Sequence, residues 1–288
     1  MDKFKVKEET YRKLFFIPLL LLAFSILVVG NAYIQGNLLE LDIDLKGGVQ
    51  ISMAYTTPID SSSMESQLEE ILGTSDVRVR TTSDLAGAQT GIQIEAGIED
   101  PVVFEEAVES ILGIELNDEN RSITNFGSTL ASSFWRQARK AIMWSVLLMC
   151  AIIFFGFKRK ILFGAILLNV FADMITTIAF MHIFNIQLSL ASIAALLMIL
   201  GTGVDSNILL STRAFRERGG QMVNRINEAL VTGLTMATTL LLVLSSILIF
   251  ASAPALKTIT SVLLIGMSVD TLYTWTMNVN VLLRWGKQ

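Results

Sequence analysis

The sequence predicts a polytopic α-helical membrane protein with six transmembrane helices and a small α+β domain, of ferredoxin-like type, between the first two helices. Three observations support this prediction. Hydrophobic residues make up 52% of the 288 residues, and the mean hydropathy is +0.57. The apolar residues are concentrated in runs of about 20, the length that crosses a bilayer as a helix. A single long polar stretch follows the first run, and it alternates strand and helix signals.

The first apolar run is longer than a signal-peptide core and lacks a convincing cleavage site, so we predict a retained span. The last run is longer than one crossing requires and is expected to tilt or to begin in the interface. The predicted segments are a cytoplasmic N-terminus at 1–13, spans at 14–34, 141–157, 161–184, 188–210, 229–251 and 255–283, an outer domain at 35–134, and a five-helix membrane domain at 135–288.

The distribution of basic residues sets the predicted orientation. With the N-terminus in the cytoplasm, most basic residues fall on the cytoplasmic side, and Lys257 is the exception in the short outer loops. Arg136, Arg139 and Lys140 end a long outer domain, and such domains largely escape the rule. We therefore expect a multi-pass protein of the cytoplasmic membrane with both termini cytoplasmic. The cytoplasmic basic residues would be Lys3, Lys5, Lys7, Arg12, Lys13, Lys158, Arg159, Lys160, Arg213, Arg216, Arg218, Arg225, Arg284 and Lys287.

The outer domain shows the order strand, helix, strand, strand, helix, with a last strand expected near Ile114 or at 122–126. This order is the split βαβ pattern of ferredoxin-like domains. Asp60 or Ser61 can cap the first helix, and Asp100 before a proline begins the second. The domain has no cluster of histidine, cysteine or paired acids, which favours a packed domain for binding or spacing. The remaining predicted elements are strands at 49–55, 77–82 and 91–96, a turn at 83–87, and helices at 60–72 and 100–113.

Three acids lie inside the apolar runs, where lipid cannot solvate them, so each is expected to face protein or water. Asp205 lies about 10 Å from the predicted cytoplasmic end of its span, and Asp173 and Asp270 lie about 18–20 Å from theirs. Small and polar residues recur near them at helical spacing and so form a polar stripe along each span. We expect these stripes to converge into a polar seam between the helices. The other members of these stripes are Gly201, Gly203, Asn207, Asn169, Thr176, Thr177, Thr232, Thr235, Thr239, Gly266, Thr274 and Asn278.

Two interpretations of these acids stay open. In the functional one, Asp205, Asp173 and Asp270 are candidates for a proton or ion relay, because a carboxylate inside a membrane protein can bind and release a proton. In the structural one, the acids hydrogen-bond to threonines and asparagines and hold the helices together. His182 lies near the outer end of the third span with no second ligand candidate nearby in sequence, which favours an interfacial residue over a metal ligand.

Other classes of function lack support in the sequence. A net charge of −4 gives no case for nucleic-acid binding. The single cysteine, Cys150, excludes an internal disulfide and a thiolate metal cluster. The chain has no phosphate-binding loop and no nucleophile with an adjacent base. We therefore expect no enzyme activity, no cofactor and no metal site.

Four short motifs occur in order along the chain. Asp44, Gly47 and Gly48 belong to a D-L-K-G-G motif after the first span, residues 172–176 lie in the third span, residues 203–207 lie in the fourth with Arg213 after them, and residues 226–239 open the fifth. Their order and spacing resemble the SecD/SecF family of protein-export membrane proteins. The chain length and the single modest outer domain are closer to SecF than to the longer SecD.

Two departures from the bacterial pattern suggest an archaeal-type SecF: Asp205 sits one position earlier than the acid of bacterial SecF, and Thr232 stands where an arginine occurs. A third, smaller difference is Ala172, which stands where a histidine occurs. The resemblance implies one half of a resistance-nodulation-division-type bundle, completed by a SecD-like subunit. It also implies a complex in the lipid bilayer that assists the Sec translocation channel in moving preproteins, with proton coupling in the bacterial case.

The span count leads independently to a partner, because a six-span chain without a second half expects a repeat-related subunit. We expect that subunit to pack on the spans bearing Gly201 or Gly266. One alternative is a half-size, proton-coupled secondary transporter of small molecules or lipids that works as a homo-oligomer; another is a structural scaffold. The short outer domain, poor in aromatic residues, disfavours small-molecule transport.

Overall fold

The computed structural model describes residues 11, 13–36, 38–83, 89–117, 120–156, 160–215, 221–251 and 253–285. The chain divides into two compact units, a helical unit of Met1–Glu40 and Lys140–Gln288 and an α+β unit of Leu41–Arg139. Several predicted features lie outside the described residues: most of the N-terminal segment 1–13, the turn at 84–87, and the basic residues 158, 159, 216, 218 and 287.

Within the described residues, six helices are long and apolar enough to cross a membrane. This number confirms the six predicted spans. The first span is the nineteen-residue helix α2, which precedes the α+β unit in the chain. The last span is divided into three segments. The helices are α2 (Phe16–Ile34), α6 (Ser128–Gly156), α7 (Lys160–Ile183), α8 (Leu190–Phe215), α9 (Met222–Phe250), α10 (Pro254–Tyr273) and α11 (Val279–Trp285).

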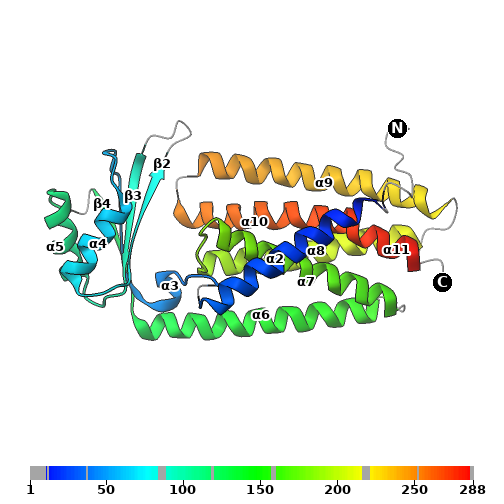
Figure 1. Ribbon diagram of the computed structural model, residues 1–288, viewed down its shortest axis with the longest axis horizontal. Coiled ribbons are helices and arrows are strands. Elements are labelled where there is room, and N and C mark those ends of the chain that lie inside the picture. The colour runs from blue at the N-terminus through cyan, green and yellow to red at the C-terminus, as the bar shows by residue number, and fades with distance from the viewer. Residues whose placement is uncertain are drawn as a thin grey trace. The chain divides into compact units, whose positions relative to one another are not determined.

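Helix α10 lies at the centre of the helical unit and contacts α7, α8 and α9 (Figure 1). In the apolar windows of α7 and α8, about half of the residues are buried, at 56% and 50%, whereas only 6% are buried in α9. Helix α2 packs on α7, and α6 packs through Met149 and Ile153 against α7 and α8. The outward faces of α2, α6 and α9 are therefore the faces available to lipid or to another subunit.

The last span contains a π-helical turn at Thr274–Asn278, between α10 and α11. A π turn takes one more residue per hydrogen bond than an α turn, and such turns are frequent at functional sites. Thr274 and Asn278, which the sequence placed on one polar stripe, both lie within this turn and are buried. The sequence predicted the length of this span but not its change of winding.

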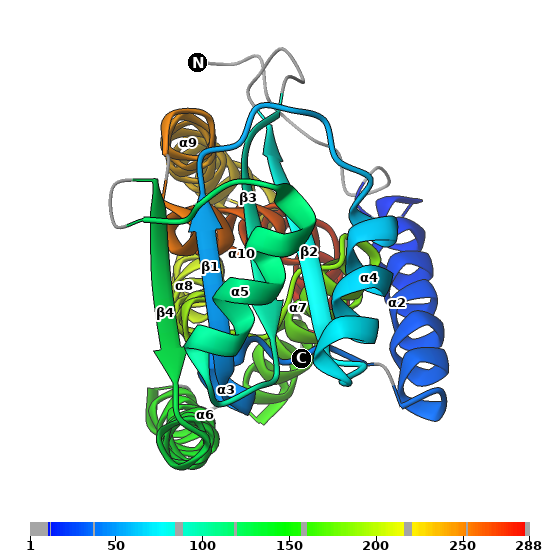
Figure 2. The same cartoon turned by 90° about the vertical axis from the view of Figure 1, so that its left-hand side faces the viewer.

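The α+β unit contains a four-stranded antiparallel sheet in the order β2-β3-β1-β4. Helices α4 and α5 cover one face of this sheet (Figure 2). The predicted ferredoxin-like arrangement is confirmed, with the last strand at the 122–126 position rather than at Ile114. The elements are a short helix α3 (Ile43–Lys46), β1 (Gly48–Met53), α4 (Ser61–Leu72), β2 (Val77–Ser83), β3 (Gln89–Ala96), α5 (Pro101–Leu112) and β4 (Arg121–Phe126).

Capping interactions fix the ends of helices α4 and α5. The carboxylate of Asp60 accepts a hydrogen bond from Ser62 N, and that of Asp100 accepts one from Val102 N. Both helices end at a glycine in the left-handed conformation, Gly73 and Gly113. Their apolar faces cover the inward residues of the sheet, such as Ile51, and complete a separate core.

The turn of the D-L-K-G-G motif shapes the start of β1. Gly47 and Gly48 have φ values of 89° and 142°, which residues with side chains rarely adopt. A Cβ on Gly48 would also collide with the carbonyl oxygen of Ala96. Asp44 lies in the first turn of α3. The motif therefore has a structural role in turning the chain into the sheet of the α+β unit.

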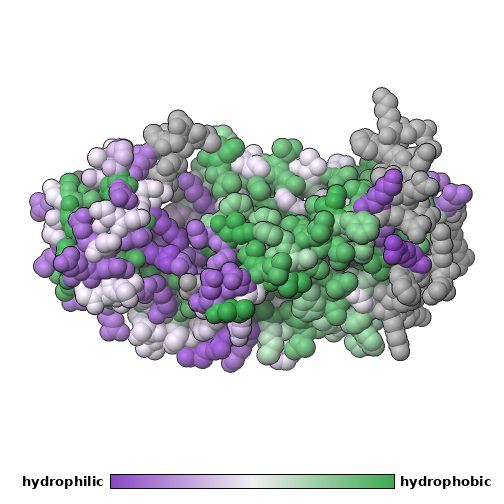
Figure 3. All heavy atoms as spheres, in the orientation of Figure 1, coloured by the Kyte–Doolittle hydropathy of each residue, from purple (hydrophilic) through white to green (hydrophobic). Residues whose placement is uncertain are grey.

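The two units differ in the chemistry of their surfaces (Figure 3). In the view shown, hydrophobic residues cover most of the helical unit, and hydrophilic residues dominate the α+β unit. Exposed side chains on the helical unit include Phe24, Leu27, Leu148 and Phe155, each more than half exposed. Such a surface suits lipid, and a mixed polar surface suits water.

Candidate functional site

Two carboxyl groups meet inside the helical unit. Asp173 on α7 and Asp270 on α10 are each 1% exposed, and their carboxyl groups lie close enough to interact directly. Both acids were candidates from the sequence, which gave no pairing between them. The structure therefore brings together two of the three predicted relay acids.

Gly203 on α8 forms a wall of this site. A Cβ added at Gly203 would lie 3.3 Å from Asp270 Oδ1 and 3.6 Å from Asp173 Oδ2. Because no side chain stands there, helix α8 can approach both carboxyl groups closely. The glycine predicted to allow close helix packing thus faces the acid pair itself.

A short hydrogen-bond network holds the pair. Asn169 Nδ2 donates to Asp173 Oδ2 over 3.2 Å and to Thr274 Oγ1 over 3.3 Å. Thr274 Oγ1 in turn donates to Asp270 Oδ1 over 3.1 Å. Asp173 Oδ1 is buried without a hydrogen-bond partner in the part of the chain that the structure describes. The network orients both acids and leaves one oxygen with free capacity to bind a proton.

A second set of polar contacts surrounds the pair. Asn278 donates from Nδ2 to Asn207 Oδ1, and Asn207 Nδ2 donates to Gly203 O over 2.7 Å. The hydroxyl groups of Thr176 and Tyr273 are 2.9 Å apart. These contacts join α7, α8 and the last span across the interior and involve Asn169, Thr176 and Asn207.

Asp205, the third predicted relay acid, is not part of this buried pair. Its side chain is exposed on the surface of this chain, in a groove of about 630 Å³ between α8, α9 and α10. Sequence reasoning expected Asp205 to face protein or water within the seam; on this chain it faces outward instead. The groove is mostly apolar, with Met236, Leu240 and Trp275 among its lining residues.

The groove nevertheless reaches the acid pair. Asp270 and Ser206 line it together with Asp205. The Ser206 hydroxyl donates to Thr202 O in its own helix over 3.2 Å. The groove therefore brings the exposed acid and one member of the buried pair to the same space.

Three further residues predicted for the seam also face outward. Thr232 and Thr239 are exposed, and each hydroxyl donates to a carbonyl oxygen one turn earlier in its own helix, Glu228 O and Thr235 O. Gly201 is exposed, and a Cβ there would meet nothing within 4 Å. The fifth-span threonines therefore do not converge on the acid pair as expected. Thr239 lines the groove that contains Asp205.

Gly266 is used inside the chain. A Cβ at this position would collide with the side chain of Ile199, which brings α10 and α8 into close contact. The subunit was expected on the span bearing Gly201 or the span bearing Gly266; Gly266 itself packs within the chain, whereas Gly201 has the open surface such a contact needs.

The described residues contain no group of three or more His, Cys, Asp or Glu side chains that could hold a metal ion. His182 lies in the last turn of α7 and is partly exposed. At the acid pair, the carboxyl groups can bind and transfer protons, with hydroxyl and amide groups as hydrogen-bonding partners.

Comparison with known proteins gives consistent matches over nearly the whole chain. A family model for the C-terminal part of the protein-export membrane proteins SecD and SecF matches residues 107–288. The chain is 32% identical to SecF of Pyrococcus furiosus over 94% of this chain and 90% of that protein. It is 30% identical to SecF of Methanocaldococcus jannaschii over 95% of both.

The fold also matches a solved structure. The crystal structure of SecDF, a translocon-associated membrane protein from Thermus thermophilus, superposes with a TM-score of 0.74 at 18% identity. The match covers 96% of this chain and 38% of that protein, so this chain spans about two-fifths of its length. The fold is that of part of SecDF, and the chain belongs to the SecD/SecF family of protein-export membrane proteins, among its SecF members.

Proposed function

We propose that this chain is the SecF-like subunit of a SecD–SecF complex in the cytoplasmic membrane, where it assists Sec-dependent translocation of preproteins by moving protons through its intramembrane acids. The observation that carries the proposal is the contact between Asp173 and Asp270 deep inside the helical unit. Two negative charges in contact and away from water would be very unfavourable, so the pair is expected to share a proton.

A proton held by such a pair can be exchanged with a donor at the surface. Ser206 and Asp270 line the same groove as Asp205. We therefore infer the order Asp205, Ser206, Asp270 and Asp173 for proton transfer. A carboxylate exposed in an otherwise apolar groove would be poorly solvated by lipid, so Asp205 requires a partner helix or water beside it.

The same groove indicates where a partner subunit would pack. Gly201 and Asp205 share the exposed face of α8, and Gly201 has nothing within 4 Å. A small residue on an open helix face allows another helix to approach closely. The SecDF relative contains a second portion beyond the part that this chain matches. A SecD-like subunit that packs on this face would cover Asp205 and complete the bundle; the Sec channel and a preprotein are the further partners.

The proposed orientation has both termini in the cytoplasm and the α+β unit outside. Single cysteines at Ser62, which is exposed on α4, and at Gln288 test it in a Cys150→Ser background. A membrane-impermeant maleimide should label Ser62→Cys in intact cells and Gln288→Cys only after lysis. Labelling of both positions in intact cells would overturn the orientation.

The test of function is export of a reporter preprotein in cells that lack the native copy. Asp270→Asn, Asp173→Asn and Asp205→Asn should each lower export at normal membrane levels, because asparagine keeps the shape but cannot release a proton. Glu228→Gln is the matched control, an exposed acid on α9 outside the site. Full export by all three variants would remove the relay, and purification with native partners as a homo-oligomer alone would favour the half-size transporter.

A further inference from the structure

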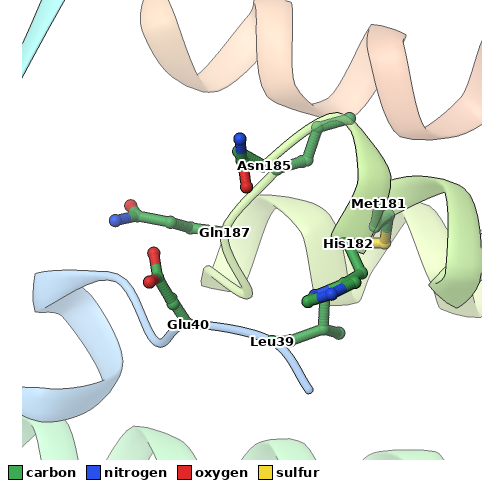
Figure 4. Close-up of a pocket in the computed structure, with 7 residues that line it drawn as sticks. Leu39, Glu40, Met181, His182, Asn185 and Gln187 are labelled. Atoms are coloured by element: carbon green, nitrogen blue, oxygen red, sulfur yellow. The ribbon is translucent and has the colours of Figure 1, made fainter. Parts of the chain in front are cut away.

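A polar cavity lies at the end of the helical unit where α7 ends (Figure 4). Its volume is about 170 Å³, enough for a small ligand or several waters. None of the three acids of the candidate site lines it, and on α7 it lies about two turns beyond Asp173. The lining residues are Leu39, Glu40, Met181, His182, Asn185, Ile186 and Gln187.

Backbone hydrogen bonds fix the walls of this cavity. Asn185 has φ 52°, in the left-handed region, and ends α7. Its N–H donates to His182 O over 3.2 Å, and Ile186 N donates to Met181 O over 2.8 Å, which is the pattern of a Schellman motif. Leu188 N donates to Glu40 O over 2.8 Å, so the segment after α2 runs beside the loop after α7. The cavity is therefore built from ordered backbone.

Gln187 is the unusual residue of this cavity. Its side chain is 4% exposed, yet neither Nε2 nor Oε1 has a hydrogen-bond partner among the described residues. Buried polar groups are almost always hydrogen-bonded, and an orphaned carboxamide calls for a ligand or an ordered water. The missing partner must offer a donor for Oε1 and an acceptor for Nε2.

The charge around the cavity favours a cation as the donor. Glu40 contributes a carboxylate, the C-terminal end of α7 contributes partial negative charge, and the lining residues include no lysine or arginine. Figure 4 shows the Glu40 carboxylate and the carboxamides of Asn185 and Gln187 beside the same loop. Only two lining residues, Glu40 and His182, are common metal ligands, so an organic ammonium suits the site better than a metal ion.

The position along the helices favours a lipid as the carrier of that ammonium. Helices α2 and α7 end at Ile34 and Ile183, so the cavity lies at the level where spans leave the hydrocarbon. Ile183 and Phe184, between the lining residues His182 and Asn185, and Ile34, at the end of α2, are exposed apolar side chains, at 43%, 61% and 84%. These side chains offer a surface for acyl chains beside a polar cavity of headgroup size.

We propose that this cavity binds the headgroup of a membrane lipid that carries a primary ammonium and a phosphate. The ammonium donates to Glu40 and to Gln187 Oε1, and Gln187 Nε2 donates to a phosphate oxygen. A quaternary ammonium has no N–H group and leaves Gln187 Oε1 without a donor. The proposal holds in either leaflet and does not depend on protein export.

The test compares thermal unfolding of the full chain in nanodiscs of phosphatidylcholine with and without phosphatidylethanolamine. Phosphatidylethanolamine should raise the unfolding midpoint of the unaltered chain by a few degrees, because a ligand that binds only the folded state stabilises it. Gln187→Leu should abolish this rise and should unfold no earlier than the unaltered chain in phosphatidylcholine alone, since it removes the orphaned carboxamide. Gln35→Leu, which alters an exposed carboxamide near the end of α2, should keep the rise.

Three results would overturn the proposal. Equal midpoints in the two lipids would mean that only water fills the cavity. An equal rise for Gln187→Leu would mean that the lipid acts on the bilayer and not at this site. A rise of the same size with soluble phosphoethanolamine in phosphatidylcholine nanodiscs would assign the site to a free phosphorylated amine instead of a lipid.

Discussion

Asp173 and Asp270 meet carboxyl to carboxyl, although one comes from α7 and the other from α10, and Gly203 of α8 closes the space beside them. Two acids in contact are a poor way to hold helices together, because at least one must stay protonated for the contact to be favourable. The relationship therefore favours the relay interpretation over the structural one, and the two interpretations give different results on substitution.

We expect Asp173→Asn to change the free energy of unfolding by less than about 1 kcal/mol, because the amide takes the place of the protonated carboxyl group of the pair and keeps a hydrogen bond. Export should fall at least about tenfold. The double variant Asp173→Asn/Asp270→Asn should export no worse than either single one, since each breaks the same transfer step. A loss of about 1.5–3 kcal/mol in each single variant, measured by denaturant unfolding in detergent, would instead support a structural role.

Gly203→Ala tests whether the space beside the pair matters. Its Cβ would lie 3.3 Å from Asp270 Oδ1, which is tight enough to displace that side chain. The helix gains up to about 1 kcal/mol from alanine, so the chain should still fold while export falls. Gly164→Ala is the matched control, because this exposed glycine of α7 has nothing within 4 Å. Equal export by both variants would mean that the carboxyl groups tolerate displacement.

The sequence predicted the spans and the α+β unit because both depend on local signals. Runs of apolar residues give the number of helices, and acids such as Asp60 and Asp100 give helix starts through their caps. The ferredoxin-like order of elements then follows from a small set of allowed connections. None of these inferences requires knowledge of which helices are neighbours.

The site was only partly predictable, because it depends on how each helix is rotated. Gly203 and Asn207 are four residues apart and both buried; Gly201 and Asp205 are also four apart and both exposed. Positions 203 and 205 differ by about 200° around a helix, so they cannot face the same neighbour. Apolar periodicity is weak in spans that lipid and protein surround together, so the sequence left this rotation undetermined.

The contact between Gly266 and Ile199 gives a prediction about helix packing. Gly266→Ala should destabilise the chain by about 1–3 kcal/mol, because its Cβ would collide with Ile199 Cδ1 and overpack the α8–α10 contact. Ile199→Val removes the Cδ1 atom and should restore much of the loss in the double variant. Thermal unfolding of the unaltered chain, the two single variants and the double variant in detergent measures the coupling energy between the two positions. Additive effects of the two substitutions would mean that these residues are not in contact.

Tyr11 gives a prediction about alkaline stability. This residue, 1% exposed, lies ahead of α2; its hydroxyl donates to Asn227 Oδ1 over 2.9 Å, and its carbonyl oxygen accepts from Asn280 Nδ2. Burial raises the pKa of the Tyr11 phenol from 10.0 to about 12. Above pH 10 the unfolded chain releases this proton while the folded chain retains it, so stability is complete below pH 10 and is lost as the pH rises through 12.

Tyr11→Phe should therefore unfold more easily than the unaltered chain at pH 8, by about 1 kcal/mol for the lost hydrogen bond. Between pH 10 and 12 its stability should fall less steeply, so the two curves should converge. Tyr33→Phe serves as control, because Tyr33 is 75% exposed, and it should follow the unaltered chain throughout. Parallel curves for Tyr11→Phe and the unaltered chain up to the highest pH would mean that the phenol is not buried in the folded protein.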